Sequence, residues 1–174
     1  MDVGEYMKKI AEFKKVSFEI YKEELIKNFD ISQDACKMYY DNIELPKRAT
    51  TGSAGYDFKL PFSITLKPGE TKKIPTGIRV NMADGWVLVL VPRSSLGFKY
   101  RMQLDNTLGI IDSDYYYSDN EGHIILKVTN DSKENKEMIV EASKGICQGL
   151  FLEFGITLDD DAKATRNGGF GSTN

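Results

Sequence analysis

The chain has few of the residues from which metal centres and cross-linked scaffolds are built. Among its 174 residues there are only two cysteines, Cys36 and Cys147, and one histidine, His123. Two distant cysteines support neither a disulfide framework nor a thiolate metal site, and free thiols in a reducing cytoplasm are the simplest explanation. A lone histidine leaves no histidine cluster for zinc, so we expect any catalysis to depend on carboxylates.

Long apolar runs and a one-sided charge are also absent. No segment approaches the roughly 18 apolar residues of a membrane span, and Met1 to Glu5 lack the basic-then-apolar layout of a signal peptide. The 26 acidic and 23 basic residues give a net charge of −3 without a basic block, which argues against duplex nucleic acid as a partner. We therefore expect one cytoplasmic domain that binds neither nucleic acid nor membrane.

The residues before about position 45 have a pattern of their own. Lys9 to Val16 are compatible with a short strand, and Ser17 stands where a helix N-cap would. Ser32 is placed to cap a second helix. The apolar residues of the first helix recur at helical spacing: Phe18, Tyr21, Leu25 and Phe29. Residues 1–44 are therefore predicted to be an N-terminal leader of one short strand and two helices.

From Pro46 onward the apolar period changes to two. Ile78 to Met82 alternate, Asp84-Gly85 is a hairpin signal, and the apolar run Trp86 to Val91 follows. Such short strands, repeated at 123–129, 137–140 and 149–154, predict an all-β sandwich or closed barrel over residues 45–158. The acidic run 159–161 is expected to be the hinge of a C-terminal arm, residues 159–174.

Three internal segments contain side chains that are candidates for catalysis or for binding phosphate or a metal ion. Leu104 to Tyr115 lead an apolar run into Asp112 and Asp114, an arrangement typical of a hairpin that delivers a base into a cleft, or of a solvated turn. Pro92 to Gly97 place an arginine and two hydroxyls around a small-residue bend, which suits phosphate but also occurs by chance. Ala54 to Asp57 present one carboxylate, which either turns a strand or holds a water on a hard cation.

The C-terminal sequence from Arg166 to Asn174 combines three glycines with one guanidinium, one aromatic ring and two hydroxyls. Chain ends are often frayed. A guanidinium and hydroxyls are nevertheless the groups that bind a triphosphate, and an aromatic ring is the group that stacks on a base.

Five segments, in sequence order, resemble the five motifs of the trimeric dUTP pyrophosphatases. They are Ala54 to Asp57, Pro92 to Gly97, Asn106 to Tyr115, Gly145 to Gln148, and Arg166 to Thr173. Each motif alone is weak evidence for the family, but five of them in order over residues 45–174 are a very specific match. The resemblance implies a jelly-roll-like β-barrel, a homotrimer with active sites at subunit contacts, and hydrolysis of dUTP to dUMP and pyrophosphate.

The same resemblance implies a role for each matching residue. Asp112 activates the water that attacks the α-phosphorus, and Asp57 holds waters on a Mg²⁺ bound mainly by the phosphates. Tyr115 lies under the deoxyribose and excludes a 2′-hydroxyl. The other substrate contacts fall into three sets: Asn106 with the backbone of Gly109, Ile110 and Ile111 for uracil; Arg93, Ser94, Ser95 and Gln148 for phosphate; and Arg166, Phe170, Gly171 and Ser172 on the closing arm, with Phe170 stacked on uracil.

Three features depart from the family pattern. Tyr116 to Glu121 intervene before Gly122 and are expected to lengthen the hairpin beyond the uracil pocket. The fourth motif lacks its usual arginine, since Gly145 stands three residues before Gln148 and Lys144 is only a neighbour. The leader has no counterpart in the minimal family core.

Two other functions compete with the pyrophosphatase. A dCTP deaminase or a bifunctional deaminase–pyrophosphatase shares the fold but needs a catalytic Glu near the attacked carbon. The hairpin offers Asp112 with no Glu before Glu121. A non-catalytic module that binds a regulatory protein would explain the leader and the three tyrosines at 115–117. It would not require a complete set of catalytic residues.

Overall fold

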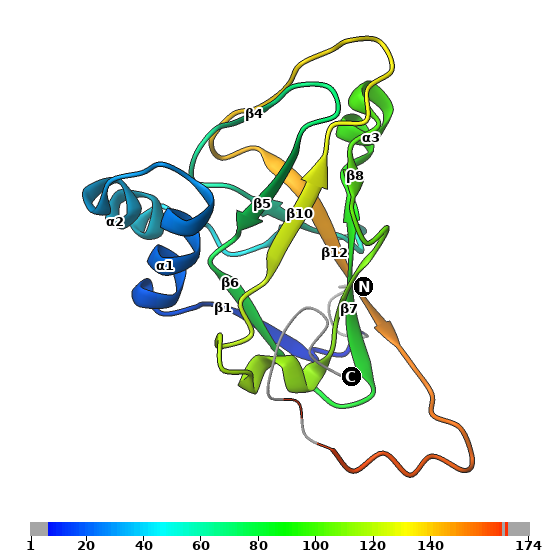
Figure 1. Cartoon of the computed structure of the whole chain (residues 1–174). Coiled ribbons are helices and arrows are strands. Elements are labelled where there is room, and N and C mark those ends of the chain that lie inside the picture. Colours follow the sequence, from blue (N-terminus) through cyan, green and yellow to red (C-terminus); the bar gives the residue numbers. More distant parts are fainter. Residues whose placement is uncertain (1–6, 165, 167–174) are drawn as a thin grey trace.

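Antiparallel sheets build the body of the molecule (Figure 1), a computed structural model that describes residues 7–164 and 166. The largest sheet has five strands in the order β2 (Lys47–Arg48), β3 (Tyr56–Lys59), β12 (Gly145–Glu153), β7 (Trp86–Pro92) and β9 (Gly109–Ile111). Strand β7 pairs with the middle strand, β12, over its full length and with β9 through Leu88 to Leu90. Five of the predicted site residues lie on its strands: Asp57, Gly109, Ile110, Ile111 and Gln148.

Three smaller sheets complete the described part of the chain. One contains β5 (Thr71–Pro75), β10 (Ile125–Thr129) and β8 (Gln103–Leu104), and two pairs join β4 (Ile64–Leu66) to β11 (Met138–Val140) and β1 (Ala11–Lys15) to β6 (Ile78–Met82). All the strand pairs described are antiparallel. The prediction of an all-β fold is confirmed, as are the strands expected at 78–82, 86–91, 123–129 and 137–140.

The turn at Asp84-Gly85 is present, but it does not form the expected hairpin. Gly85 has a φ of +80°, as the sequence predicts. The strands on either side belong to different sheets, because β1 occupies the edge of β6 while β7 pairs with β12 and β9. The turn is therefore a corner between two sheets. Strand β6 pairs with the distant β1 instead of with β7, its neighbour in sequence.

The N-terminal strand and helices pack into the main core. Helix α1 (Phe18–Asn28) begins at Ser17, whose hydroxyl accepts from the Ile20 N–H, and α2 (Gln33–Asp41) begins at Ser32 in the same way. Both helices cover one side of the sheets in Figure 1. Their core side chains Tyr21, Leu25 and Cys36 have no exposed surface and join one cluster with the barrel. Truncating one such buried leucine to alanine costs about 2–5 kcal/mol.

Two segments expected as a bend and a hairpin are helical instead. The Arg93 to Gly97 stretch opens α3 (Ser94–Tyr100), and the residues after Asp112 form a 3₁₀-helix, η2 (Ser113–Tyr117). Residues 116–121 do not extend a hairpin beyond the cavity described below. They finish η2 and turn back toward β6, because Arg79 on that strand donates to the Tyr116 carbonyl at 2.7 Å.

The chain leaves the five-stranded sheet at Glu153, well before the acidic run 159–161. Phe154 still donates its N–H to the Gly85 carbonyl at 3.0 Å. The residues after it extend away from the sheets in Figure 1, and along this stretch Ile156 is 75% exposed and Leu158 is fully exposed. Within residues 7–164 and 166, no helix has the length and apolar character needed to cross a bilayer.

The buried His123 predicts how stability depends on pH. Its Nε2 accepts from the Gly77 N–H at 2.9 Å, and burial lowers its pKa from the ordinary 6.5 to about 4, against the opposing charge of Glu121. Between these values the unfolded chain holds a proton that the folded chain does not. The free energy of unfolding should therefore fall with decreasing pH in this window, by up to about 1.4 kcal/mol per pH unit.

Urea unfolding of the wild type and of His123→Gln between pH 7 and pH 4.5, at one protein concentration, measures this contribution. The glutamine amide can still accept from Gly77 but does not titrate. The stability difference between the two proteins should shrink as the pH falls. A difference that stays constant over this range would contradict the assignment.

Candidate active site

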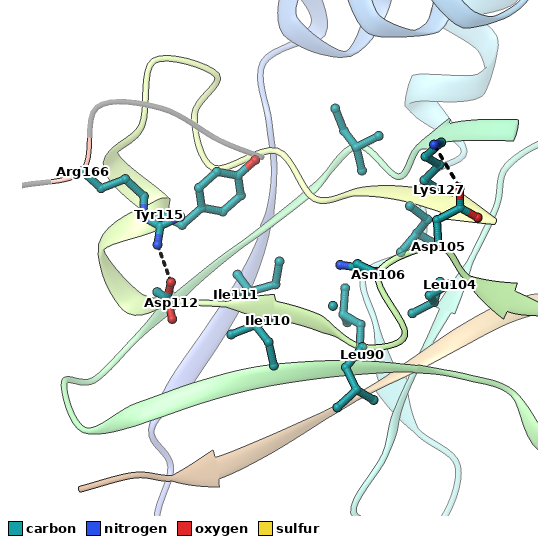
Figure 2. Close-up of a pocket in the computed structure, with 14 residues that line it drawn as sticks. Leu90, Leu104, Asp105, Asn106, Ile110, Ile111, Asp112, Tyr115, Lys127 and Arg166 are labelled. Atoms are coloured by element: carbon teal, nitrogen blue, oxygen red, sulfur yellow. Dashed lines mark hydrogen bonds and ion pairs between the residues drawn. The ribbon is translucent and has the colours of Figure 1, made fainter. Parts of the chain in front are cut away.

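A cavity of about 350 Å³ opens beside β9, and Figure 2 shows the side chains that line it. One wall is the loop between β8 and β9 together with β9 itself, and the opposite wall is β10. The start of η2 and Arg166 close one end. The lining residues that the sequence predicted for a site are Asn106, Gly109, Ile110, Ile111, Asp112, Tyr115 and Arg166.

Strand β9 is held close to β7 because Gly109 has no side chain. A Cβ at this position would lie 2.9 Å from the Cβ of Leu90, the residue opposite on β7. The loop before the strand turns through Thr107, which has a φ of +68° and donates its N–H to the Leu104 carbonyl at 2.8 Å. Asn106 is exposed at the cavity wall.

Asp112 follows β9 directly and precedes the first residue of η2. Its carbonyl accepts from the Tyr115 N–H at 3.2 Å, so the carboxylate is presented from a fixed backbone. In Figure 2 the Arg166 guanidinium points at it, and Nη2 of Arg166 forms an ion pair with Oδ2 of Asp112. The Arg166 Nε lies 3.3 Å from Asp114. Arg166, predicted to bind phosphates, thus contacts two carboxylates.

Tyr115 is the only one of the three consecutive tyrosines that lines the cavity within the described residues. It is 4% exposed, its hydroxyl donates to the His123 carbonyl at 2.8 Å, and Asn120 donates to the same hydroxyl at 2.8 Å. Burial raises the pKa of Tyr115. Tyr116 packs on the Arg79 guanidinium at 3.7 Å, and Tyr117 is 75% exposed.

A second group of predicted residues gathers where β3, β12 and the end of β7 meet. Gln148 lies opposite Asp57 on β3 and opposite Val91 on β7. The Arg93 Nε lies 3.4 Å from the Asp57 carboxylate. Ser94 and Ser95 are exposed in the first turn of α3.

Two glycines make room for this second group. A Cβ on Gly55 would lie 2.5 Å from Oε1 of Gln148, and a Cβ on Gly145 would lie 2.8 Å from Cδ of Arg93. The Gln148 amide and the Arg93 stem therefore fill the space that side chains at 55 and 145 would occupy. This explains why the first and fourth motifs contain glycine at these positions.

The structure therefore places the described site residues in two groups. Asn106, Gly109, Ile110, Ile111, Asp112, Tyr115 and Arg166 line the cavity, whereas Asp57, Arg93, Ser94, Ser95 and Gln148 do not. The strand of the first group, β9, and the strands of the second, β12 and β3, lie on opposite sides of β7 in one sheet. Phe170, Gly171 and Ser172 lie outside the described residues.

The sequence pattern missed a charged pair at the cavity wall. The Lys127 ammonium lies 3.0 Å from Asp105, which also accepts from the Thr129 hydroxyl at 2.6 Å. Burial alone would raise the pKa of Asp105, but these two partners bring it below its usual value. Alternation along β10 predicts that Lys127 is exposed. Its partner Asp105 lies in the turn after β8 and is not predictable from that pattern.

No set of three or more His, Cys, Asp or Glu side chains within residues 7–164 and 166 gathers closely enough to hold a metal ion. Asp57, predicted to hold waters on Mg²⁺, has a carboxylate that contacts Arg93. Its oxygens are hard ligands, which suit Mg²⁺ rather than zinc.

The dUTPase family model matches residues 41–174. The deoxyuridine 5′-triphosphate nucleotidohydrolase of Lactococcus lactis subsp. lactis is 42% identical over 134 residues, which cover 75% of this chain and 88% of that protein. The crystal structure of dUTPase from Streptococcus mutans superposes with a TM-score of 0.62 at 32% identity and covers 83% of this chain and 97% of that one.

A dUTPase from phage phi11 of S. aureus, solved as a mutant with a structural Mg(II) ion, has the same fold with a TM-score of 0.61. It is 15% identical and covers 88% of this chain and 97% of that one. The expected fold type is thus confirmed. The matched family model, the sequence relatives and the cavity built from the third motif lead to one conclusion: the chain belongs to the dUTPase family.

Proposed function

We propose that the protein hydrolyses dUTP to dUMP and pyrophosphate, which limits uracil incorporation into DNA and supplies dUMP for thymidylate synthesis. The observation that carries the proposal is the cavity that presents Asn106, the β9 backbone, Tyr115 and Asp112 together. The pocket would take the base, the Tyr115 ring would lie against the sugar, and the Asp112 carboxylate would lie near the α-phosphate. The relatives named above support the choice of uracil.

Asp112 is proposed to be the general base. It removes a proton from a water whose oxygen bonds to the α-phosphorus, and the bond between that phosphorus and the bridging oxygen breaks to release pyrophosphate. Arg166 forms an ion pair with this carboxylate. When the triphosphate is bound, Arg166 exchanges the carboxylates for phosphate oxygens, together with the arm residues Phe170, Gly171 and Ser172.

The phosphates are proposed to lie against Arg93, Ser94, Ser95 and Gln148. Asp57 is expected to contact Mg²⁺ through water, because one carboxylate beside an amide oxygen fits an ion that keeps most of its waters and takes phosphate oxygens as ligands. Bound Mg²⁺ would supply positive charge that offsets the charge on the leaving pyrophosphate. Without the usual fourth-motif arginine, Arg93 and Arg166 carry most of the basic charge here.

We also propose a homotrimer whose active sites lie at subunit contacts. The separation of the site residues into two groups supports it, since neither group alone has both a base and a phosphate site. In this arrangement residues 45–158 form the hydrolase core and 159–174 form the arm that closes over bound nucleotide. The buried thiols of Cys36 and Cys147 support a reducing cytoplasm as its location.

Replacing the proposed base tests the reaction. Asp112→Asn should lower kcat for pyrophosphate release from dUTP by roughly 10²–10⁴, the usual contribution of a general base. Asp114→Asn is the matched control, since Asp114 contacts the same arginine without being the base. In this control kcat should fall by no more than about fivefold, which corresponds to the contribution of an exposed ion pair.

The assay should cover dUTP, UTP and the four standard deoxynucleoside triphosphates, with ammonia measured in parallel. Ammonia released from dCTP would identify a deaminase instead. If Asp112→Asn kept more than about a tenth of the wild-type kcat, Asp112 would not be the base.

Subunit complementation tests the shared site. Asp112→Asn and Arg93→Ala should each be nearly inactive, and trimers refolded from an equal mixture should regain about a quarter of wild-type activity, because one site in four would draw both residues from intact copies. Sedimentation equilibrium should return three times the chain mass. A mixture that stays inactive would contradict sites built from two subunits.

Tyr115 is expected to reject ribose, because a ring that packs under the sugar leaves no room for a 2′-hydroxyl. Tyr115→Ala should narrow the dUTP/UTP ratio of kcat/KM by about tenfold or more and also slow dUTP turnover. Tyr117→Ala is the control, since Tyr117 is exposed and away from the cavity. Loss of discrimination in the control alone would show that another tyrosine carries this role.

A further inference from the structure

The inserted residues before Gly122 contact the start of the first helix, about a hundred positions earlier in the chain. The Ser17 N–H donates to Oε2 of Glu121 at 2.7 Å, and the Arg79 Nη1 lies 3.6 Å from the same oxygen. Glu121 thus joins α1 and β6 to the segment that follows η2. Burial alone would raise the pKa of Glu121, but Ser17 and Arg79 hold it below its usual value.

The backbone at Glu121 is in a conformation that a glutamate rarely adopts. Its φ is +58°, and Gly122 follows with a φ of +69°. A non-glycine residue in the left-handed region costs on the order of 1 kcal/mol and persists where surrounding contacts hold it. The bonds of the Glu121 carboxylate to Ser17 and Arg79 are such contacts.

This turn brings the chain directly back onto Tyr115. A Cβ on Gly122 would lie 2.7 Å from the Tyr115 carbonyl oxygen. The Glu121 N–H donates to the Ser118 carbonyl at 2.7 Å, and the Ser118 N–H donates to the Tyr115 carbonyl at 3.1 Å. The residues on either side of Glu121 also hold the ring, because Asn120 and His123 bond the Tyr115 hydroxyl.

A second connection runs through His123. Its Nε2 accepts from the Gly77 N–H, and the Gly77 carbonyl accepts from the Val16 N–H at 3.0 Å. Arg79 adds a third, since it donates to the Tyr116 carbonyl at 2.7 Å. Tyr115 therefore lies between the cavity and a network of bonds that begins at Val16 and Ser17.

We infer that Glu121 is a positioning residue that holds Tyr115 against the cavity by bonding the start of α1. The N-terminal strand and first helix, residues 11–28, are then part of the support of the sugar-binding wall rather than a separate appendage. The inference rests on the proposed role of Tyr115 in rejecting ribose.

Two pairs of variants test this support from its two ends. Glu121→Ala removes the acceptor, whereas Glu121→Gln keeps an oxygen for the Ser17 N–H. Ser17→Pro removes the N–H donor at a φ of −61°, which proline adopts without strain, whereas Ser17→Ala keeps the donor and loses only the hydroxyl. Glu134→Ala, at an exposed pair with Lys136, is the control for loss of a surface glutamate.

Glu121→Ala and Ser17→Pro should each narrow the dUTP/UTP ratio of kcat/KM by at least about fivefold and speed amide exchange at residues 115–118. Glu121→Gln, Ser17→Ala and Glu134→Ala should stay within about twofold of the wild type. The ratio does not depend on the fraction of folded enzyme, so general destabilisation would leave it unchanged. An unchanged ratio in both disruptive variants would overturn the inference.

Exchange rates separate this inference from the proposed function. If the wild type itself failed to discriminate dUTP from UTP, the role of Tyr115 would be wrong. Faster amide exchange at 115–118 in Glu121→Ala and Ser17→Pro, but not in Glu121→Gln and Ser17→Ala, would still show that the start of α1 holds this segment. If exchange were also unchanged in the two disruptive variants, the proposed link between α1 and this segment would be wrong as well.

Discussion

The register of β7 between its two neighbours is the constraint on which the rest of the structure depends. Leu90 on this strand lies opposite Gly149 on β12 and opposite Gly109 on β9. Side chains at either glycine would collide with those of β7, since a Cβ on Gly149 would lie 2.7 Å from Leu88. Because side chains alternate between faces, a slip of one residue would turn every one of them to the other face.

Both halves of the site depend on that register. Strand β9 brings its backbone and Asp112 to one side of β7, and β12 brings Gln148 to the other, while β7 ends at Pro92, directly before Arg93. Gln148 lies on a paired strand, and Asp112 and Arg93 each follow directly after one. Placement of this kind would keep the proposed base and the proposed phosphate contacts within the narrow tolerance that catalysis demands.

The N-terminal residues add a constraint from outside this sheet. Tyr21, Leu25 and Cys36 are buried in the common core, and Phe13 packs its ring edge-on against Phe58 at 5.6 Å. Through Ser17 and Val16 the same segment reaches the turn that holds Tyr115. Two of the three departures from the family pattern, the leader and residues 116–121, are therefore in contact with each other.

The sequence by itself determined the all-β class, both leader helices with their serine caps, most strands, and the family, because those follow from local periodicity, capping and ordered motifs. It did not determine which strands pair or which distant side chains contact one another. Asp84-Gly85 predicted a turn, yet β1 displaced the local hairpin; Arg166 contacts Asp112; and Glu121 bonds Ser17. Only the tertiary structure decided these, because contacts between residues distant in the chain depend on which edges and faces the whole fold brings together.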